Sequence, residues 1–163
     1  MTPKVSAIKK NGATFTPREL AMFLATKLMT FAESEGKDRI SVLDPACGDG
    51  SLLHAILHVG KARISSVVGY DTNASYIDVT HSLLHDVPDH LELECRDFLS
   101  VCPNHTDLFS VDTRSEFADI VIANPPYVRT QVLGAQKAQQ LARDFDLTGR
   151  VDLYYPFLMA MTN

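Results

Sequence analysis

Short apolar runs rich in β-branched residues alternate along this chain with longer segments in which apolar residues recur at helical spacing. Each short run has the length and composition of a buried strand. Strands are predicted at 40–43, 65–70, 91–95 and 119–123, and helices at 17–31, 52–57, 74–85 and 153–161, while 136–143 is predicted to be helical or mobile. The alternation predicts an α/β fold with a mostly parallel sheet and flanking helices.

The first predicted helix has a clear start signal. Thr16 is followed by Pro17 and Glu19, an order typical of an N-cap, a first-turn proline and a capping box. The apolar residues that follow recur at helical spacing and predict an amphipathic helix: Leu20, Phe23, Leu24, Leu28 and Phe31. We therefore predict an N-terminal helical segment, 1–38, followed by a sheet-containing core, 39–163.

A polar residue follows each predicted strand. Asp44, Asp71, Asp97 and Asn124 are separated by intervals of 27, 26 and 27 residues. This near-regular period is that of repeated βαβ units. Because the carboxyl ends of parallel strands face one edge of a sheet, these side chains are expected to converge on one cleft.

The turn after the first strand is rich in glycine. It reads Asp44-Pro45-Ala46-Cys47-Gly48-Asp49-Gly50 and lies between a strand and a helix, which is typical of the start of a Rossmann-like unit. Its spacing is neither the dinucleotide pattern G-x-G-x-x-G nor a P-loop, because no G-K-[ST] follows. Gly48 and Gly50 allow a ligand to approach the backbone closely, since they carry no side chain.

The fourth predicted strand ends in a stiff loop. Within 118–127, an apolar run is followed by Asn124, Pro125, Pro126 and Tyr127. The prolines donate no backbone N–H and fix φ, so the chain can continue neither a strand ladder nor a helix there. The loop offers an amide, a carbonyl outside the sheet and an aromatic ring at the edge where α/β sheets bind ligands.

Composition and charge narrow the classes of protein. The 163 residues suit one domain, and 45% hydrophobic with 21% charged residues is ordinary for a globular protein. We expect no membrane span, no signal peptide and a cytoplasmic location. Three cysteines without a C-x-x-C pair indicate neither a disulfide framework nor a zinc site, and no metal is expected at the pairs His54/His58 and His81/His85. A net charge of −5 argues against this chain alone binding the phosphate backbone of a nucleic acid.

These motifs, in this order, resemble the class I S-adenosylmethionine-dependent N6-adenine DNA methyltransferases of the gamma group. The resemblance rests on Phe15-Thr16-Pro17, the glycine-rich turn, Asp71, Asp97-Phe98 and Asn124-Pro125-Pro126-Tyr127. The tail 152–158 is similar to a motif of bifunctional restriction–modification enzymes. The resemblance implies methyl transfer from S-adenosyl-L-methionine to the N6 amino group of an adenine rotated out of DNA.

The resemblance also implies a role for each motif. Phe15 and Thr16 would line the methionine end of the cofactor, Asp71 would bind the ribose hydroxyls and Asp97 the adenine amino group, while Phe98 and Phe157 would pack near the adenine ring. The pocket around the methionine portion would be formed by Asp44, Ala46, Gly48 and Gly50. The catalytic residues would be Asn124, Pro125 and Tyr127, and the target adenine would contact Asn124, Pro126 and Tyr127.

The chain is shorter than the resemblance requires. The family fold has about seven strands, of which four are predicted here, and no residues remain for a target-recognition domain. We expect the missing strands and that domain to be supplied in cis or in trans. Two alternatives stay open: a methyltransferase acting on a protein glutamine or an RNA base, and a catalytically inactive cofactor-binding fragment.

Overall fold

The computed structural model describes residues 15–84, 90–101, 118–128, 134–147 and 152–162. The chain forms two compact units, and each is described by itself. The sheet unit comprises 15–98 and 116–124, and the second unit comprises 1–14, 99–115 and 125–163. No helix in the described ranges is long and apolar enough to cross a bilayer.

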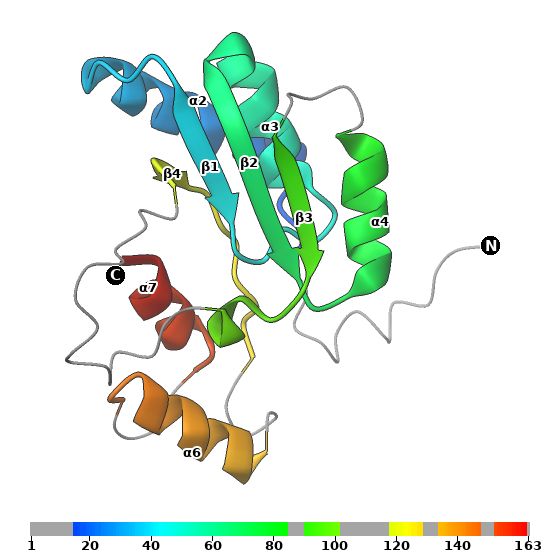
Figure 1. Ribbon diagram of the computed structural model, residues 1–163, viewed down its shortest axis with the longest axis vertical. Coiled ribbons are helices and arrows are strands. Elements are labelled where there is room, and N and C mark those ends of the chain that lie inside the picture. The colour runs from blue at the N-terminus through cyan, green and yellow to red at the C-terminus, as the bar shows by residue number, and fades with distance from the viewer. Residues whose placement is uncertain (1–14, 85–89, 102–117, 129–133, 148–151, 163) are drawn as a thin grey trace. The chain divides into compact units, whose positions relative to one another are not determined.

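The sheet unit contains four strands that pair only in parallel (Figure 1). They are β1 (Ile40–Asp44), β2 (Ile64–Asp71), β3 (Leu91–Cys95) and β4 (Ile120–Val121), in the order β3-β2-β1-β4. The predicted α/β fold and its strands are confirmed. β4 is shorter than the predicted 119–123, although Ile122 N donates to Leu43 O at 3.0 Å and extends the contact with β1.

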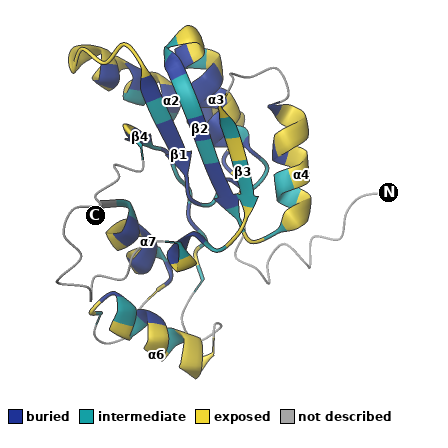
Figure 2. Cartoon of the chain, in the orientation of Figure 1, coloured by how far each residue is buried: buried dark blue, intermediate teal, exposed yellow. Residues whose placement is uncertain are grey.

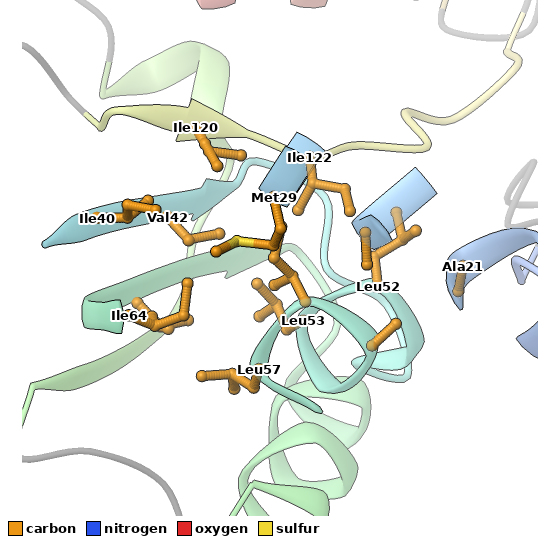
Figure 3. Packing of buried hydrophobic residues seen from close by; sticks show 14 of the residues in the cluster. Ala21, Met29, Ile40, Val42, Leu52, Leu53, Leu57, Ile64, Ile120 and Ile122 are labelled. Carbon is orange, nitrogen blue, oxygen red and sulfur yellow. The ribbon is translucent and has the colours of Figure 1, made fainter. Parts of the chain in front are cut away.

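Helices α2 (Arg18–Ser34) and α3 (Ser51–Gly60) lie together on one side of the sheet, behind the strands in Figure 1. A short 3₁₀ helix, η1 (Lys61–Arg63), precedes β2, and α4 (Ala74–Leu83) connects β2 to β3. Apolar side chains of α2, α3 and the strands form one core, in which Figure 3 shows Met29 and Leu53 near Ile40, Val42 and Ile120. Figure 2 shows the central strands largely buried and α4 exposed on its outer side.

The second unit contains two α-helices in its described residues, α6 (Ala135–Asp144) and α7 (Tyr154–Thr162). A 3₁₀ helix, η2 (Phe98–Ser100), lies at the boundary between the units. The predictions at 136–143 and 153–161 are confirmed as helices. Residues 101–117, for which the sequence predicts a loop or an excursion with a weak helix, lie almost entirely outside the described residues.

The start of α2 differs from the sequence prediction. The helix begins at Arg18 with Pro17 as its N-cap, and no side chain caps it. Ala21 N donates to the Pro17 carbonyl at 2.9 Å, so the first helical hydrogen bond comes one residue later than an N-cap at Thr16 requires. The capping box predicted from Thr16 and Glu19 is therefore wrong, because the Thr16 hydroxyl has another partner.

The buried face of α2 also differs from the apolar stripe read from the sequence. The residues fully packed into the core are Ala21, Ala25, Met29 and Ala32. Of the predicted stripe, Leu24 and Leu28 are partly buried against this core, whereas Leu20, Phe23 and Phe31 are exposed. Small side chains let α2 approach α3 and the sheet closely. The helix therefore buries the face that carries them and not the face with its largest apolar residues.

Asp119 fastens β4 to the start of β1. Its Oδ2 accepts hydrogen bonds from Ser41 N at 2.9 Å and Ser41 Oγ at 2.8 Å, and its Oδ1 pairs with the Lys37 ammonium. The hydrogen bonds from Lys37 and Ser41 lower the pKa of Asp119 to about 2. This group of bonds compensates for a strand that is only two residues long.

We predict that Asp119→Ala lowers the free energy of unfolding by about 1–3 kcal/mol, because Ser41 and Lys37 lose their acceptor. A carboxylate with a lowered pKa stabilises above its ordinary pKa and loses that effect as the pH falls through about 2. The gap between wild type and variant should therefore shrink between pH 4 and pH 2 in urea titrations.

Glu33→Ala is the matched control, since it removes an ion pair, to Arg63 at 2.6 Å, in which Glu33 is 62% exposed. It should cost less than about 1 kcal/mol. Equal losses for the two variants would contradict the anchoring role of Asp119.

Candidate active site

The sheet has a switch point between β1 and β4. From β1 the chain proceeds outward to β2 and β3, whereas β4 returns to the other side of β1. In open α/β sheets, ligands bind outside the carboxyl ends of the strands at such a point. Asp44 ends β1, Asp71 ends β2, and Asn124 follows β4, so this edge brings together three of the four predicted strand-end residues.

The glycine-rich turn is held against the end of β2. Asp71 Oδ2 accepts from Gly48 N at 3.0 Å, and Cys47 N donates to Tyr70 O at 2.8 Å. Asp71 Oδ1 accepts from Asn73 N at 2.8 Å. Asp71 therefore shapes the turn, a role that sequence reasoning missed, and each of its oxygens keeps a second lone pair for a ligand.

Both glycines of this turn are in the left-handed region, with φ of 54° at Gly48 and 78° at Gly50. A Cβ at Gly50 would lie 2.8 Å from the Thr80 methyl group, which is closer than packing allows. Thr80 on α4 is fully buried and donates from Oγ1 to Gly48 O at 2.9 Å. Sequence reasoning missed Thr80, although its spacing from Ile77 and Leu84 places it on the inner face of that helix.

Asp44 is a buried carboxyl with an unpaired oxygen. Its Oδ1 accepts from Ala46 N at 3.0 Å, whereas Oδ2 is buried and has no hydrogen-bond partner in the described part of the chain. Burial, with repulsion from Asp71 and Asp49, raises the pKa of Asp44 to about 7. An orphaned acidic oxygen beside a ligand-binding turn suits a ligand that carries positive charge or N–H groups.

Cys47 is not a candidate nucleophile. Burial and the neighbouring carboxyl of Asp44 raise the pKa of its thiol. The reactive form of cysteine is the thiolate, so this side chain is a packing residue. Its sulfur lies 3.4 Å from the position a Cβ would take at Gly69, which places it against the strands.

The Phe-Thr-Pro segment contacts both the glycine-rich turn and Asn124. A ring carbon of Phe15 lies 3.6 Å from the position of a Cβ on Gly48, and the same ring meets Tyr76 edge to face at 5.4 Å. Asn124 Nδ2 donates to Thr16 Oγ1 at 3.1 Å. Residues 108 positions apart in sequence are thus joined directly at this edge.

Asp97 and Phe98 follow β3. Phe98 is 1% exposed and packs on Tyr70 with ring centroids 5.6 Å apart, so it belongs to the core of the sheet unit. Asp97 is half-buried. The adenine-binding roles implied for this pair remain predictions.

The remaining predicted residues lie in the second unit. Pro125 is buried, Pro126 half-buried and Tyr127 64% exposed. The Tyr127 ring stacks on Tyr154 with centroids 6.1 Å apart and planes inclined by 10°. Leu153 N donates to Val128 O at 3.0 Å, so the segment before α7 supports the end of the Asn-Pro-Pro-Tyr loop. Phe157 is buried in α7.

Among the described residues, no group of three or more His, Cys, Asp or Glu side chains is arranged to hold a metal.

Comparison with known proteins shows the family of the chain. A family model described as N-6 DNA methylase matches residues 4–153. The chain belongs to this family. The type II methyltransferase M.BanIII of Aneurinibacillus aneurinilyticus is 40% identical over 164 aligned positions, which cover 94% of this chain and 28% of that relative.

Solved structures share the fold of this methylase-family chain. A class I S-adenosylmethionine-dependent methyltransferase from Listeria monocytogenes, described as putative in its own report, matches with a TM-score of 0.65 and 21% identity over 92% of this chain and 42% of its own. A type I restriction-modification methyltransferase subunit from Streptococcus thermophilus gives a TM-score of 0.65 and 21% identity over 91% of this chain and 31% of its own. The predicted class I methyltransferase fold is therefore confirmed, and the chain spans less than half the length of these relatives.

Gly50→Ala should destabilise the sheet unit, because its new Cβ would collide with Thr80 and because φ is positive. The matched control is Gly36→Ala, where φ is +70° and no atom lies within 4 Å of the Cβ position. We expect Gly36→Ala to cost about 1 kcal/mol from backbone strain alone and Gly50→Ala to cost more, measured by urea unfolding. Similar losses at the two glycines would show that Thr80 does not constrain the turn.

The stability of the unliganded chain should depend on pH through Asp44. Because the pKa is higher in the folded chain, at about 7, than its ordinary value of 3.8, the unfolded state releases this proton first as the pH rises. The stabilising contribution is present below about pH 4 and is lost as the pH approaches 7. Asp44→Asn should flatten this part of the pH profile of unfolding, while the control Asp78→Asn on exposed α4 should keep it. Parallel profiles for wild type and Asp44→Asn would contradict the burial argument.

Proposed function

We propose that this chain is the cofactor-binding and catalytic-loop part of a restriction–modification enzyme that methylates the N6 amino group of adenine in DNA. The observation that carries the proposal is the hydrogen bond between Asn124 and Thr16, at the edge that also holds the glycine-rich turn. A side-chain amide at that position can select an exocyclic amine. Family membership and the likeness to M.BanIII support DNA as the substrate.

The residues of the turn suit S-adenosyl-L-methionine, the cofactor that the family implies. This cofactor supplies an electrophilic methyl group on a positively charged sulfur. The unpaired Asp44 oxygen supports placing the cationic methionine portion beside the turn formed by Ala46, Gly48 and Gly50. Phe15, whose ring faces Gly48, would cover that portion.

Other residues would bind the ribose and the adenine ring of the cofactor. Asp71 would bind the ribose hydroxyls through lone pairs that the turn does not use. Asp97 would accept the adenine amino group. Phe98 and Phe157 would pack near the adenine ring, and both are buried in their own units.

The catalytic loop can make an adenine amine reactive without a strong base. The lone pair of this amine is delocalised into the ring, so the nitrogen is a poor nucleophile. The Asn124 side-chain oxygen and the Pro125 carbonyl would accept its two N–H groups, which localises the lone pair and aims it at the methyl group. Once the nitrogen carries positive charge, its proton leaves readily.

The target base would be bound outside the duplex. Tyr127 would stack on the extruded adenine, a contact worth about 1–3 kcal/mol per base, and Pro126 would lie beside it. The exposed Tyr127 ring supports this role. Since the net charge is −5, the phosphate-binding surface would be supplied by the recognition domain and strands that complete the enzyme in cis or in trans.

Asn124→Ala should abolish methyl transfer, because the amine loses an acceptor, while cofactor affinity changes little. Transfer of tritiated methyl groups to DNA, RNA and protein substrates by the full gene product measures the first effect, and calorimetry with S-adenosylmethionine measures the second. Retained transfer to DNA by the variant would contradict the catalytic role of Asn124. Transfer by the wild type to RNA or protein instead of DNA would favour the alternative methyltransferases.

A further inference from the structure

We propose that Thr16 is a positioning residue that fixes the orientation of the Asn124 amide. The inference rests on the proposed function and goes beyond the cofactor contact that the sequence suggested for Thr16. It assigns the Thr16 hydroxyl to the substrate side of the site. The carrying observation is the hydrogen bond from Asn124 Nδ2 to Thr16 Oγ1 at 3.1 Å.

The Thr16 hydroxyl is available for this contact because it does not cap α2. Pro17 is the N-cap of α2, and the structure shows no side-chain cap hydrogen bond there among the described residues. Thr16 is 9% exposed, so its hydroxyl requires a protein partner inside the structure. Asn124, in the same unit, provides that partner.

Proline controls the direction in which this hydroxyl points. A residue before proline is kept out of the helical region, so Thr16 is extended. Side chains of consecutive extended residues point to opposite sides. Accordingly, the Phe15 ring meets Gly48 and Tyr76, while the Thr16 hydroxyl meets Asn124. One stiff dipeptide therefore touches both the cofactor turn and the catalytic amide.

The contact matters because the two ends of an amide are chemically opposite. A carboxamide is planar, so a bond from Nδ2 to Thr16 turns Oδ1 to the other side of the group. Oδ1 is the atom that must accept an N–H of adenine. If the amide were rotated by half a turn, it would present a donor to a donor. In the observed arrangement the Thr16 hydroxyl accepts from Nδ2, and one such bond favours this placement of the side chain over an unheld one about fivefold to tenfold.

Kinetics on the full gene product separate this role from a cofactor role. Thr16→Val keeps the shape of the side chain and removes the hydroxyl, whereas Thr16→Ser keeps the hydroxyl. We expect Thr16→Val to lower kcat about tenfold with less than about a twofold change in cofactor Kd, and Thr16→Ser to restore most of kcat. A raised Kd for S-adenosylmethionine with kcat unchanged would overturn the proposal and return Thr16 to the cofactor.

A second readout does not depend on activity. In ¹⁵N-edited spectra, the side-chain amide signals of Asn124 are identified by their loss in Asn124→Asp. Thr16→Val should move the hydrogen-bonded proton upfield and speed its exchange with water, and Thr16→Ser should not. An unchanged signal in Thr16→Val overturns the proposal whatever the activity. If Thr16→Val moves the signal but the wild-type protein methylates no substrate, the hydrogen bond is established. The proposed function and the catalytic purpose of the contact are then overturned.

Discussion

The parallel pairing of β4 with β1 brings the last strand of the sheet unit beside the first, and the candidate site depends on this contact. Without it, Asn124 would lie at the end of an unattached segment, far in sequence from the glycine-rich turn. The strand itself is only two residues long, so its ladder bonds alone are a weak tether. Asp119, through Ser41 and Lys37, and the bond from Ile122 N to Leu43 O fasten it at both ends. The geometry of the candidate site is thus held by interactions outside the Asn-Pro-Pro-Tyr loop.

Two carboxyl groups near the glycine-rich turn, those of Asp71 and Asp44, have different roles. Asp71 accepts one backbone N–H at each oxygen, which shapes the turn, and keeps a second lone pair on each. Asp44 is buried and only half satisfied, and repulsion from Asp71 adds to the cost of ionising it. The buried Asp44 carboxyl therefore lacks a partner in the unliganded turn. A cationic ligand would supply that partner, and its binding would stabilise the folded chain.

Sequence pattern was sufficient for the strands, their order of appearance and the sheet edge at which Asp44, Asp71 and Asn124 lie, because period and spacing determine these features. Sequence pattern was wrong about the residue at which α2 begins and about which of its faces is most deeply buried. There, two apolar stripes compete, and the stripe with three alanines is the one buried in the core that includes α3. It also missed Thr80 and the turn-shaping role of Asp71. These contacts join elements distant in sequence, and no local pattern records which backbone group a buried hydroxyl or carboxylate will meet.

The two functional loops achieve rigidity by different physical means, and the difference follows from what each must present. The glycine-rich turn must let a ligand reach its backbone, so its own side chains cannot fill the space, and the turn is braced from outside by Asp71, Thr80 and Phe15. In the proposed function, the Asn-Pro-Pro-Tyr loop would present a carbonyl acceptor that is not hydrogen-bonded within the sheet. Successive prolines meet this need covalently, since they fix φ and remove the N–H groups that would continue a ladder. The Asn124 amide in that loop donates to a hydroxyl that directly precedes a third proline, Pro17.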